Sequence, residues 1–456
     1  MKTIYLSLLF LTITFHLALS QQWTVVPSPS PDPVRNILNG VCSISINDAW
    51  SVGTAGELTS STLIEHWNGS NWNVVSSPNF GIKYNELYAV QGSDANNVFA
   101  VGYYSDFGTP QMYIMHWDGA SWTNENTPIV TGGSVANNLI IFPNDIYVAG
   151  LKVVGAPGPL NGTLILHKSG SQWNIESTPN QSQNRTNTLT DIKGLSPNSL
   201  WAVGYSRNIG ELYQALILHK SGSTWTVVPV PQTLSDEYFL YNLSVIAEDN
   251  IWAVGEVNGS SGYSVLIYHY DGSVWSRVIS PGGGGGIISF SSSDIWSAGS
   301  SIVHYNGSVW TTANAPVPTN GALGFMSASS PADIWTVGRD IEGSVFKTLI
   351  MHYGKDRITG IEPVTGNIPN SYNLFQNFPN PFNPETKIKF ELPRSGFTTL
   401  KIFDMNGKVL SVLVNENKEA GNYSVKFNGA GLSSGVYFYK LSSGNYSSIK
   451  KMMIIK

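Results

Sequence analysis

Short runs of alternating or continuous apolar residues, each ended by Gly, Asn, Asp or Ser, follow one another along most of the chain. Between residues 241 and 280 they read "YNLSVIA", "IWAVGEV", "SVLIYHY" and "VWSRVIS", and turn residues such as Asp271-Gly272-Ser273 separate them. Alternation with a period of two is typical of strands, and Asp-Gly pairs favour hairpins because they tolerate positive φ. The second run is apolar on both faces, as in a strand covered on both sides. The pattern predicts four antiparallel strands.

This unit recurs along the chain at intervals of 39 to 54 residues. Each copy carries a motif that ends in glycine, at Gly53, Gly102, Gly150, Gly204, Gly255, Gly299 and Gly338. Three residues before each glycine stands an aromatic residue: Trp50, Phe99, Tyr147, Trp201, Trp252, Trp296 or Trp335. A second motif follows and begins with His66, His116, His167, His219, His269, His304 or His352. Four-stranded units repeated in this way predict a seven-bladed β-propeller.

The seventh copy ends soon after His352 and lacks the fourth strand of the unit. The segment Trp23–Pro29 near the start of the chain matches the fourth strand of the fourth copy, which begins at Trp225. We therefore predict that Trp23–Val26 completes the last blade and closes the ring, which removes the open edges of an arc. The propeller is expected to span residues 21–355.

The first twenty residues have the pattern of a secretory signal, with Lys2, a long apolar stretch and the small-residue site Ala18-Leu19-Ser20. An uncleaved membrane anchor is the alternative interpretation. Cys42 is the only cysteine, so an exported chain of this kind has no internal disulfide and depends on burial for its stability. Cys42 lies in an apolar run, and we expect a buried side chain there rather than a nucleophile.

From about Asn367 the composition changes, and the runs "TKIKFEL", "LKIFDM", "KVLSVLV", "YSVKFN" and "GVYFYKL" predict a small β-sandwich. The segments "NFPNPFNPETKI", "GLSSGVYFYKL" and "KKMMIIK" closely resemble, in order, the type A C-terminal sorting domain of the type IX secretion system of Bacteroidetes and related bacteria. The resemblance implies an immunoglobulin-like sandwich, placed here at residues 371–456 after a linker at 356–370.

The resemblance also implies a route and partners for the chain. The type IX secretion machinery would carry it from the periplasm to the outer cell surface or the medium. A sortase-like peptidase would remove the tail, and the product would be released or attached to lipopolysaccharide. The propeller itself resembles secreted repeat propellers only in a general way, which implies a fold and no activity.

The repeated histidines and tryptophans are predicted to be structural. Zinc needs three or four ligands that converge at about 2 Å, and one histidine per blade cannot provide them, so no metal or other cofactor is predicted. We expect blade packing from Trp50, Trp201, Trp252, Trp296 and Trp335, and hydrogen bonds within the blades from His66, His116, His219 and His269. Candidate partners for the histidines are the turn residues Asp48, Asp145, Asn250, Asp294 and Asp333. The run Gly282–Gly286 is interpreted as a flexible connection between blades.

A ligand site is expected where the copies differ, on loops just after the motif glycines. The candidates facing a central cavity are Tyr103, Tyr205, Arg207, Glu256 and Arg339; an ordinary solvated rim is the alternative. We predict a monomeric, non-enzymatic propeller that binds a polysaccharide or a surface protein. A glycoside hydrolase or lyase and a structural or adhesion component remain alternatives. With a net charge of -5 and no basic face, nucleic acid is not an expected partner.

Overall fold

The computed structural model describes residues 21–106, 108–153, 161–182, 186–354, 362–364, 371–394, 396–405, 407–418, 420–429, 432–444 and 446–455. All regular elements in these residues are β-strands. The predicted signal peptide, residues 1–20, lies outside them. Up to residue 354 the strands form five four-stranded sheets and one eight-stranded sheet. The larger sheet consists of two four-stranded units joined by the single parallel pair Asn161 and Thr186, which gives seven units or blades.

The strands of each blade follow one another in the chain. Blade 1 contains β2 (Asn36–Ser45), β3 (Asp48–Ala55), β4 (Ser61–Trp67) and β5 (Trp72–Val74), and blade 2 contains β6 (Tyr84–Asp94), β7 (Asn97–Ser105), β8 (Gln111–Trp117) and β9 (Trp122–Asn124). Blade 3 contains β10 (Ser134–Ile141), β11 (Asp145–Val153), β12 (Asn161–Ser169) and β13 (Gln172–Ile175), and blade 4 contains β14 (Thr186–Ser196), β15 (Ser199–Arg207), β16 (Gln214–Ser221) and β17 (Thr224–Val227).

The remaining blades repeat the pattern, except that the last one takes its fourth strand from the start of the chain. Blade 5 contains β18 (Glu237–Ala247), β19 (Asn250–Gly259), β20 (Gly262–Tyr270) and β21 (Trp275–Val278), and blade 6 contains β22 (Gly284–Ser291), β23 (Asp294–Gly299), β24 (Ile302–Tyr305) and β25 (Trp310–Thr312). Blade 7 contains β26 (Ala322–Ser330), β27 (Asp333–Glu342), β28 (Val345–Gly354) and β1 (Gln22–Val26).

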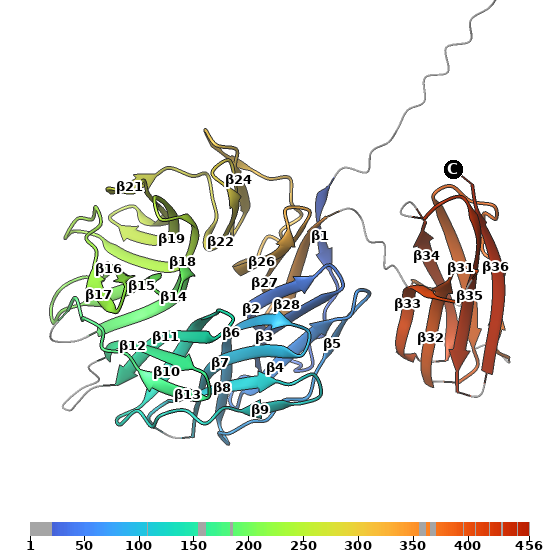
Figure 1. Cartoon of the computed structure of the whole chain (residues 1–456), viewed down its shortest axis with the longest axis horizontal. Helices are drawn as coiled ribbons and strands as arrows, with labels where there is room; N and C mark the ends of the chain where they lie inside the picture. The colour runs from blue at the N-terminus through green and yellow to red at the C-terminus, as the bar shows by residue number, and fades with distance from the viewer. Residues whose placement is uncertain are drawn as a thin grey trace, which may run out of the picture.

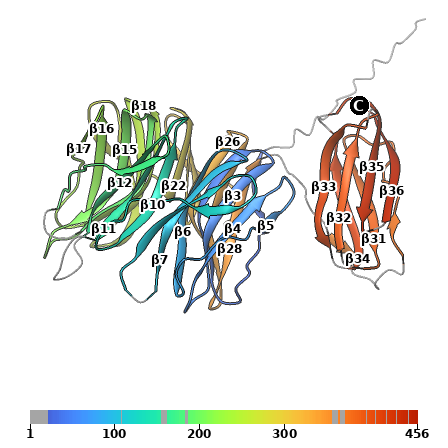
Figure 2. The ribbon, with the colours of Figure 1, turned by 60° about the horizontal axis from the view of Figure 1, so that its bottom comes forward.

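The first strands of the blades contact one another in a ring. β2 contacts β6, and contacts continue through β10, β14, β18 and β22 to β26, which in turn contacts β2. Figure 1 looks onto this ring, and Figure 2 shows the same blades from a direction turned by 60°. The ring is completed by the antiparallel pairing of β1 with β28, in which Trp23 lies opposite Tyr353. The sequence prediction for this N-terminal strand is confirmed.

Tryptophans on the fourth strands pack against the aromatic residue of the preceding blade. Trp122 of blade 2 meets Trp50 of blade 1 at 5.4 Å between ring centroids, and Trp72 of blade 1 meets Trp335 of blade 7 at 5.2 Å. Both pairs are edge-to-face, the geometry that aromatic quadrupoles favour, and such pairs contribute roughly 0.5–1.5 kcal/mol beyond area burial. These tryptophans are buried, so their role is blade packing, as predicted.

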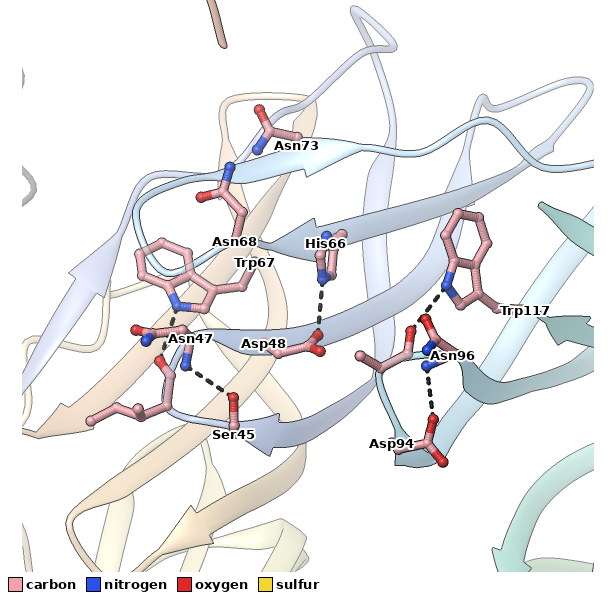
Figure 3. A network of polar contacts seen from close by, with 12 residues as sticks. Ser45, Asn47, Asp48, His66, Trp67, Asn68, Asn73, Asp94, Asn96 and Trp117 are labelled. Carbon is pink, nitrogen blue, oxygen red and sulfur yellow. Dashed lines mark hydrogen bonds and ion pairs between the residues drawn. The ribbon is translucent and has the colours of Figure 1, made fainter. Parts of the chain in front are cut away.

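Each repeated histidine lies against the aromatic residue of its own blade, and six of the seven bond to the turn of that blade. The predicted bond of His219 is not formed among the described residues, because blade 4 has Ser199 at the turn position and its hydroxyl donates to Glu248. His66 stacks on Trp50 at 4.2 Å, and its Nε2 lies 2.9 Å from Asp48 Oδ1 (Figure 3). Equivalent bonds join the predicted partners in four other blades: His167–Asp145, His269–Asn250, His304–Asp294 and His352–Asp333. Burial lowers the pKa of His116, His219 and His269, which favours neutral rings in a structural role.

The C-terminal residues form two further four-stranded sheets that share one hydrophobic core. One sheet has the order β29 (Glu362–Val364), β34 (Gly421–Asn428), β31 (Glu385–Leu392) and β30 (Asn373–Leu374). The other has the order β33 (Val409–Lys418), β32 (Gly396–Phe403), β35 (Gly435–Ser443) and β36 (Tyr446–Ile454). This is the predicted sandwich. However, β29 lies inside the predicted linker, so the first strand of this domain precedes residue 371.

Candidate binding site in the central cavity

A cavity of about 960 Å³ lies where the first and second strands of the blades meet. All seven blades contribute to its wall, from Asn39 on blade 1 to Arg339 on blade 7. Ligand pockets in proteins commonly measure about 300–1,000 Å³ and place a few polar groups in a mostly apolar lining. The cavity is therefore large enough for several sugar units or a peptide segment.

The first strand of every blade has a β-bulge that directs one residue to this cavity. In each of these strands the pairing skips the residue that follows the partner of the motif glycine. The seven residues skipped at this position line the cavity, and we call them the bulge ring: Asn39, Tyr88, Asn137, Thr190, Tyr241, Gly285 and Gly324. A bulge leaves its extra residue out of the ladder and re-aims the side chain, so the bulge ring, and not the loops, forms much of the cavity wall.

The motif glycines lie opposite these bulges. A Cβ on Gly255 would collide with the carbonyl oxygen of Phe239, and the motif glycine of every other blade has the same clash with a carbonyl in the first strand or, in blade 6, directly before it. The prediction that the strand ends at Gly255 was wrong, because β19 continues to Gly259. An isolated glycine inside a strand indicates a bulge or a close backbone approach, and this signal would have located the bulge ring from the sequence.

Three members of the bulge ring connect neighbouring blades. The side-chain amides of Asn39 and Asn137 donate to the carbonyls of Leu87 and Leu189, at 2.9 and 2.7 Å. The Thr190 hydroxyl donates to Leu240 O at 2.8 Å. Each acceptor directly precedes the bulge residue of the next blade. These bonds satisfy backbone groups that the bulges remove from the ladder.

The two tyrosines of the bulge ring pair with glutamates instead. The Tyr241 hydroxyl donates to Glu256 Oε2 at 3.1 Å on blade 5, and the Tyr88 hydroxyl donates to Glu86 Oε2 at 3.2 Å on blade 2. Tyr103 stacks on Tyr88 at 5.8 Å. Burial and the neighbouring glutamate raise the pKa of Tyr241 and Tyr88, so both hydroxyls stay protonated and act as donors.

Four of the five predicted site residues line the cavity: Tyr103, Tyr205, Glu256 and Arg339. They lie on strands, not on the loops where they were expected, because the second strands continue past the motif glycines. Arg207 is not part of the lining; its guanidinium lies 4.2 Å from the ring centroid of Tyr213. The run Gly282–Gly286 is not a loose connection, since β22 begins at Gly284 and places Gly285 in the bulge ring.

Other chemistry considered from the sequence does not enter the cavity. Cys42 is buried, and burial raises the pKa of its thiol to about 11, which keeps the sulfur protonated and unreactive. Within the described ranges there is no grouping of three His, Cys, Asp or Glu side chains able to hold a metal ion. A search of the same residues for a helix with the length and apolarity to span a membrane found none.

Comparison with known proteins identifies the tail. Residues 376–456 match the family described as the secretion system C-terminal sorting domain. No curated protein matches the chain. The C-terminal sandwich is therefore a sorting domain of the type IX secretion system, and the chain is exported to the cell surface or the extracellular space.

Solved structures similar to the chain have low sequence identity to it. YCF48 bound to D1 peptide has a TM-score of 0.47 and 15% identity, over 74% of this chain and 96% of that one. PorZ, a surface component of the type IX secretion system of Porphyromonas gingivalis, has a TM-score of 0.30 and 12% identity, over 92% and 81%. A polysaccharide lyase, an ulvan lyase, has a TM-score of 0.43 and 12% identity, over 71% and 95%. The propeller architecture of this chain follows from its own strand pairing.

Proposed function

We propose that the propeller is an extracellular, non-enzymatic module that binds a carbohydrate in its central cavity. The observation that carries this proposal is the cavity wall itself, which contains half-buried Tyr88, Tyr103, Tyr205 and Tyr241, two of them bonded to glutamates. A tyrosine ring offers a flat apolar face to a sugar ring and a hydroxyl to its oxygens. Carboxylates such as Glu256 accept hydrogen bonds from sugar hydroxyls.

A binding role is favoured over catalysis by the protonation of the tyrosines. A lyase needs a general base, and a tyrosine whose pKa is raised by burial and a nearby glutamate is a poor proton acceptor. A glycosidase needs two carboxyl groups about 5–9.5 Å apart across one bond. Here Glu86 and Glu256 stand on separate blades, and each accepts a bond from a tyrosine of its own blade.

The experiment is a polysaccharide array probed with the full-length chain without its signal peptide, followed by titration of the glycans that bind. The combined variant Tyr103→Ala, Tyr205→Ala and Arg339→Ala is expected to lose at least tenfold in affinity. Arg277→Ala, at an exposed position on the outer strand β21, serves as the control and should bind normally. Binding unchanged in the triple variant would exclude the cavity as the site. New reducing ends or unsaturated products from a bound glycan would establish an enzyme instead.

We further propose how the mature protein is made. Residues 1–20 are removed as a signal peptide, residues 21–355 fold as the propeller, and a sortase-like peptidase cuts between Gly354 and Ser371. The propeller then acts as a monomer, free or attached to lipopolysaccharide. Mass spectrometry of the protein from the culture medium and from the cell surface gives both termini and any attached glycan directly.

A further inference from the structure

Two arginines from different blades converge on one aromatic ring beside the cavity. The guanidinium carbons of Arg339, on β27, and Arg35, just before β2, each lie 5.8 Å from the ring centroid of Phe346. Arg35 is also joined to Phe346 by an isolated parallel bridge. Two positive charges therefore lie around this ring where blade 7 meets blade 1, and both attract an anion nearby.

Neither arginine has an ionic partner among the residues that the structure describes. The nearby carboxylates are bonded elsewhere: Asp32 to the backbone amides of residues 34 and 35, Asp340 to its neighbour's amide, and Glu342 to Lys347. Arg339 Nε is buried and has no hydrogen-bond acceptor within that part of the chain. A buried donor without an acceptor is unfavourable, so this N–H is suited to a ligand oxygen.

The cavity leaves space beside Arg339. This arginine lines the cavity together with Gly324, the bulge-ring residue of the same blade. A Cβ placed on Gly324 would meet no heavy atom within 4 Å, so the wall is open there. On blades 2 and 5 the corresponding positions carry the tyrosines Tyr88 and Tyr241. The cavity is therefore asymmetric, with a cationic, open side on blade 7 and hydroxyl- and carboxylate-bearing sides on blades 2 and 5.

We infer that Arg339, with the positive charge of Arg35 near the same phenylalanine ring, forms a receptor for the carboxylate or sulfate group of an acidic polysaccharide. The inference rests on the proposed carbohydrate binding and adds the class of the ligand. A guanidinium matches a planar carboxylate or a sulfate edge with two parallel N–H donors. The tyrosines across the cavity suit the hydroxyls and apolar faces of the sugar rings, and this favours a glycan over a peptide carboxylate.

The test is a calorimetric titration of the full-length chain without its signal peptide. The ligands are three oligosaccharides of equal length: a galacturonic acid oligomer, a sulfated galactose oligomer and a neutral galactose oligomer. We expect at least one acidic oligomer to bind more than tenfold tighter than the neutral one, with an affinity that falls as salt rises. Arg339→Gln should remove this preference, so that the acidic and the neutral oligomers bind the variant with similar affinity. Arg339→Lys should restore part of the preference, and Arg277→Gln should have no effect. Thermal melting of each variant reports that the fold is intact.

The opposing outcomes are distinct. Equal affinity for acidic and neutral oligomers, with no effect of Arg339→Gln, would overturn the anion receptor and leave carbohydrate binding standing. Binding of a peptide through its C-terminal carboxylate, with no binding of any oligosaccharide, would overturn both the glycan ligand and the proposed function. No binding of the three oligomers together with a negative polysaccharide array would do the same.

Discussion

The indole ring of Trp23 packs edge to face against Trp296, with 5.7 Å between the ring centroids, although the two residues come from opposite ends of the repeat array. Trp23 also contacts Tyr353, the residue opposite it in the ladder between β1 and β28. One N-terminal side chain therefore takes part both in completing blade 7 and in packing it onto blade 6.

Deletion of residues 21–29 is expected to lower the thermal stability of the propeller sharply. The deletion removes β1, exposes the edge of β28 and leaves a gap beside Trp296. Trp23→Ala alone should destabilise by about 3–5 kcal/mol, as buried tryptophan truncations do. Val25→Ala on the same strand, where the side chain is 45% exposed, should change stability by less than about 0.5 kcal/mol. Calorimetric melting measures all three, and an unchanged melting temperature of the deletion would refute closure by this strand.

Gly255→Ala is expected to destabilise the propeller by about 1–3 kcal/mol or more, because its Cβ would overlap the carbonyl of Phe239 and force the bulge of β18 to shift. Gly324→Ala is the matched control, since its Cβ meets open space within the same ring of blades. Urea unfolding followed by tryptophan fluorescence compares the two variants. Equal stability of the two would show that the bulge yields to a side chain and that the motif glycine has another role.

Glu65→Met is expected to stabilise the propeller, and to do so increasingly as the pH rises. Glu65 is fully buried, neither carboxyl oxygen has a hydrogen-bond partner among the residues that the structure describes, and burial raises its pKa well above the ordinary value. Met115 and Met351 occupy the same position in blades 2 and 7, so the substitution fits the repeat.

The sign follows from proton linkage. In the folded state Glu65 keeps its proton, because burial raises its pKa. In the unfolded state the same carboxyl loses its proton above the ordinary pKa of about 4.3. The free energy of unfolding of the wild type therefore falls as the pH rises from the unfolded pKa toward the folded pKa. The free energy of unfolding between pH 5 and 9 should fall less steeply in Glu65→Met. Glu57→Met, at an exposed position, should leave the slope unchanged. If the free energy of unfolding fell equally steeply with pH in the wild type and in Glu65→Met, this carboxyl would be solvated or paired.

His352→Ala is expected to cost about 1–3 kcal/mol more than His219→Ala. Both rings stack on a tryptophan of their own blade, at 4.2 and 4.0 Å. His352 Nε2 also bonds to the buried Asp333 at 2.8 Å, whereas His219 Nε2 has no hydrogen-bond partner within the described part of the chain. Chemical unfolding of the two variants isolates the contribution of the bond to the turn, and equal losses would assign the role of both histidines to stacking alone.

The repeat made the blades, the N-terminal strand and the histidine partners predictable, because each depends on residues that recur at the same place in every copy. The bulge ring was not predictable from alternation, since a bulge adds one residue to a strand without changing its apolar character. Asn39 and Gly324 share no chemistry, and only their place opposite a motif glycine relates them. Tyr103 and Arg339 could be singled out as residues following that glycine. The approach of Arg35 and Arg339 to the same ring, that of Phe346, could not be predicted, because it depends on the contact between the first and last blades.

The position of β28 has a mechanical consequence. When a propeller is held by its C-terminal end, a pulling force acts first on β28, the last propeller strand before the C-terminal domain. This strand is not at an edge, because β27 flanks it on one side and β1 on the other. A pull from the cell surface therefore loads two hydrogen-bonded ladders at once, and one of them belongs to the opposite end of the chain. In a chain held at the cell surface by its C-terminal end, the closure would thus divide such a load between the pairing of β28 with β27 and its pairing with β1.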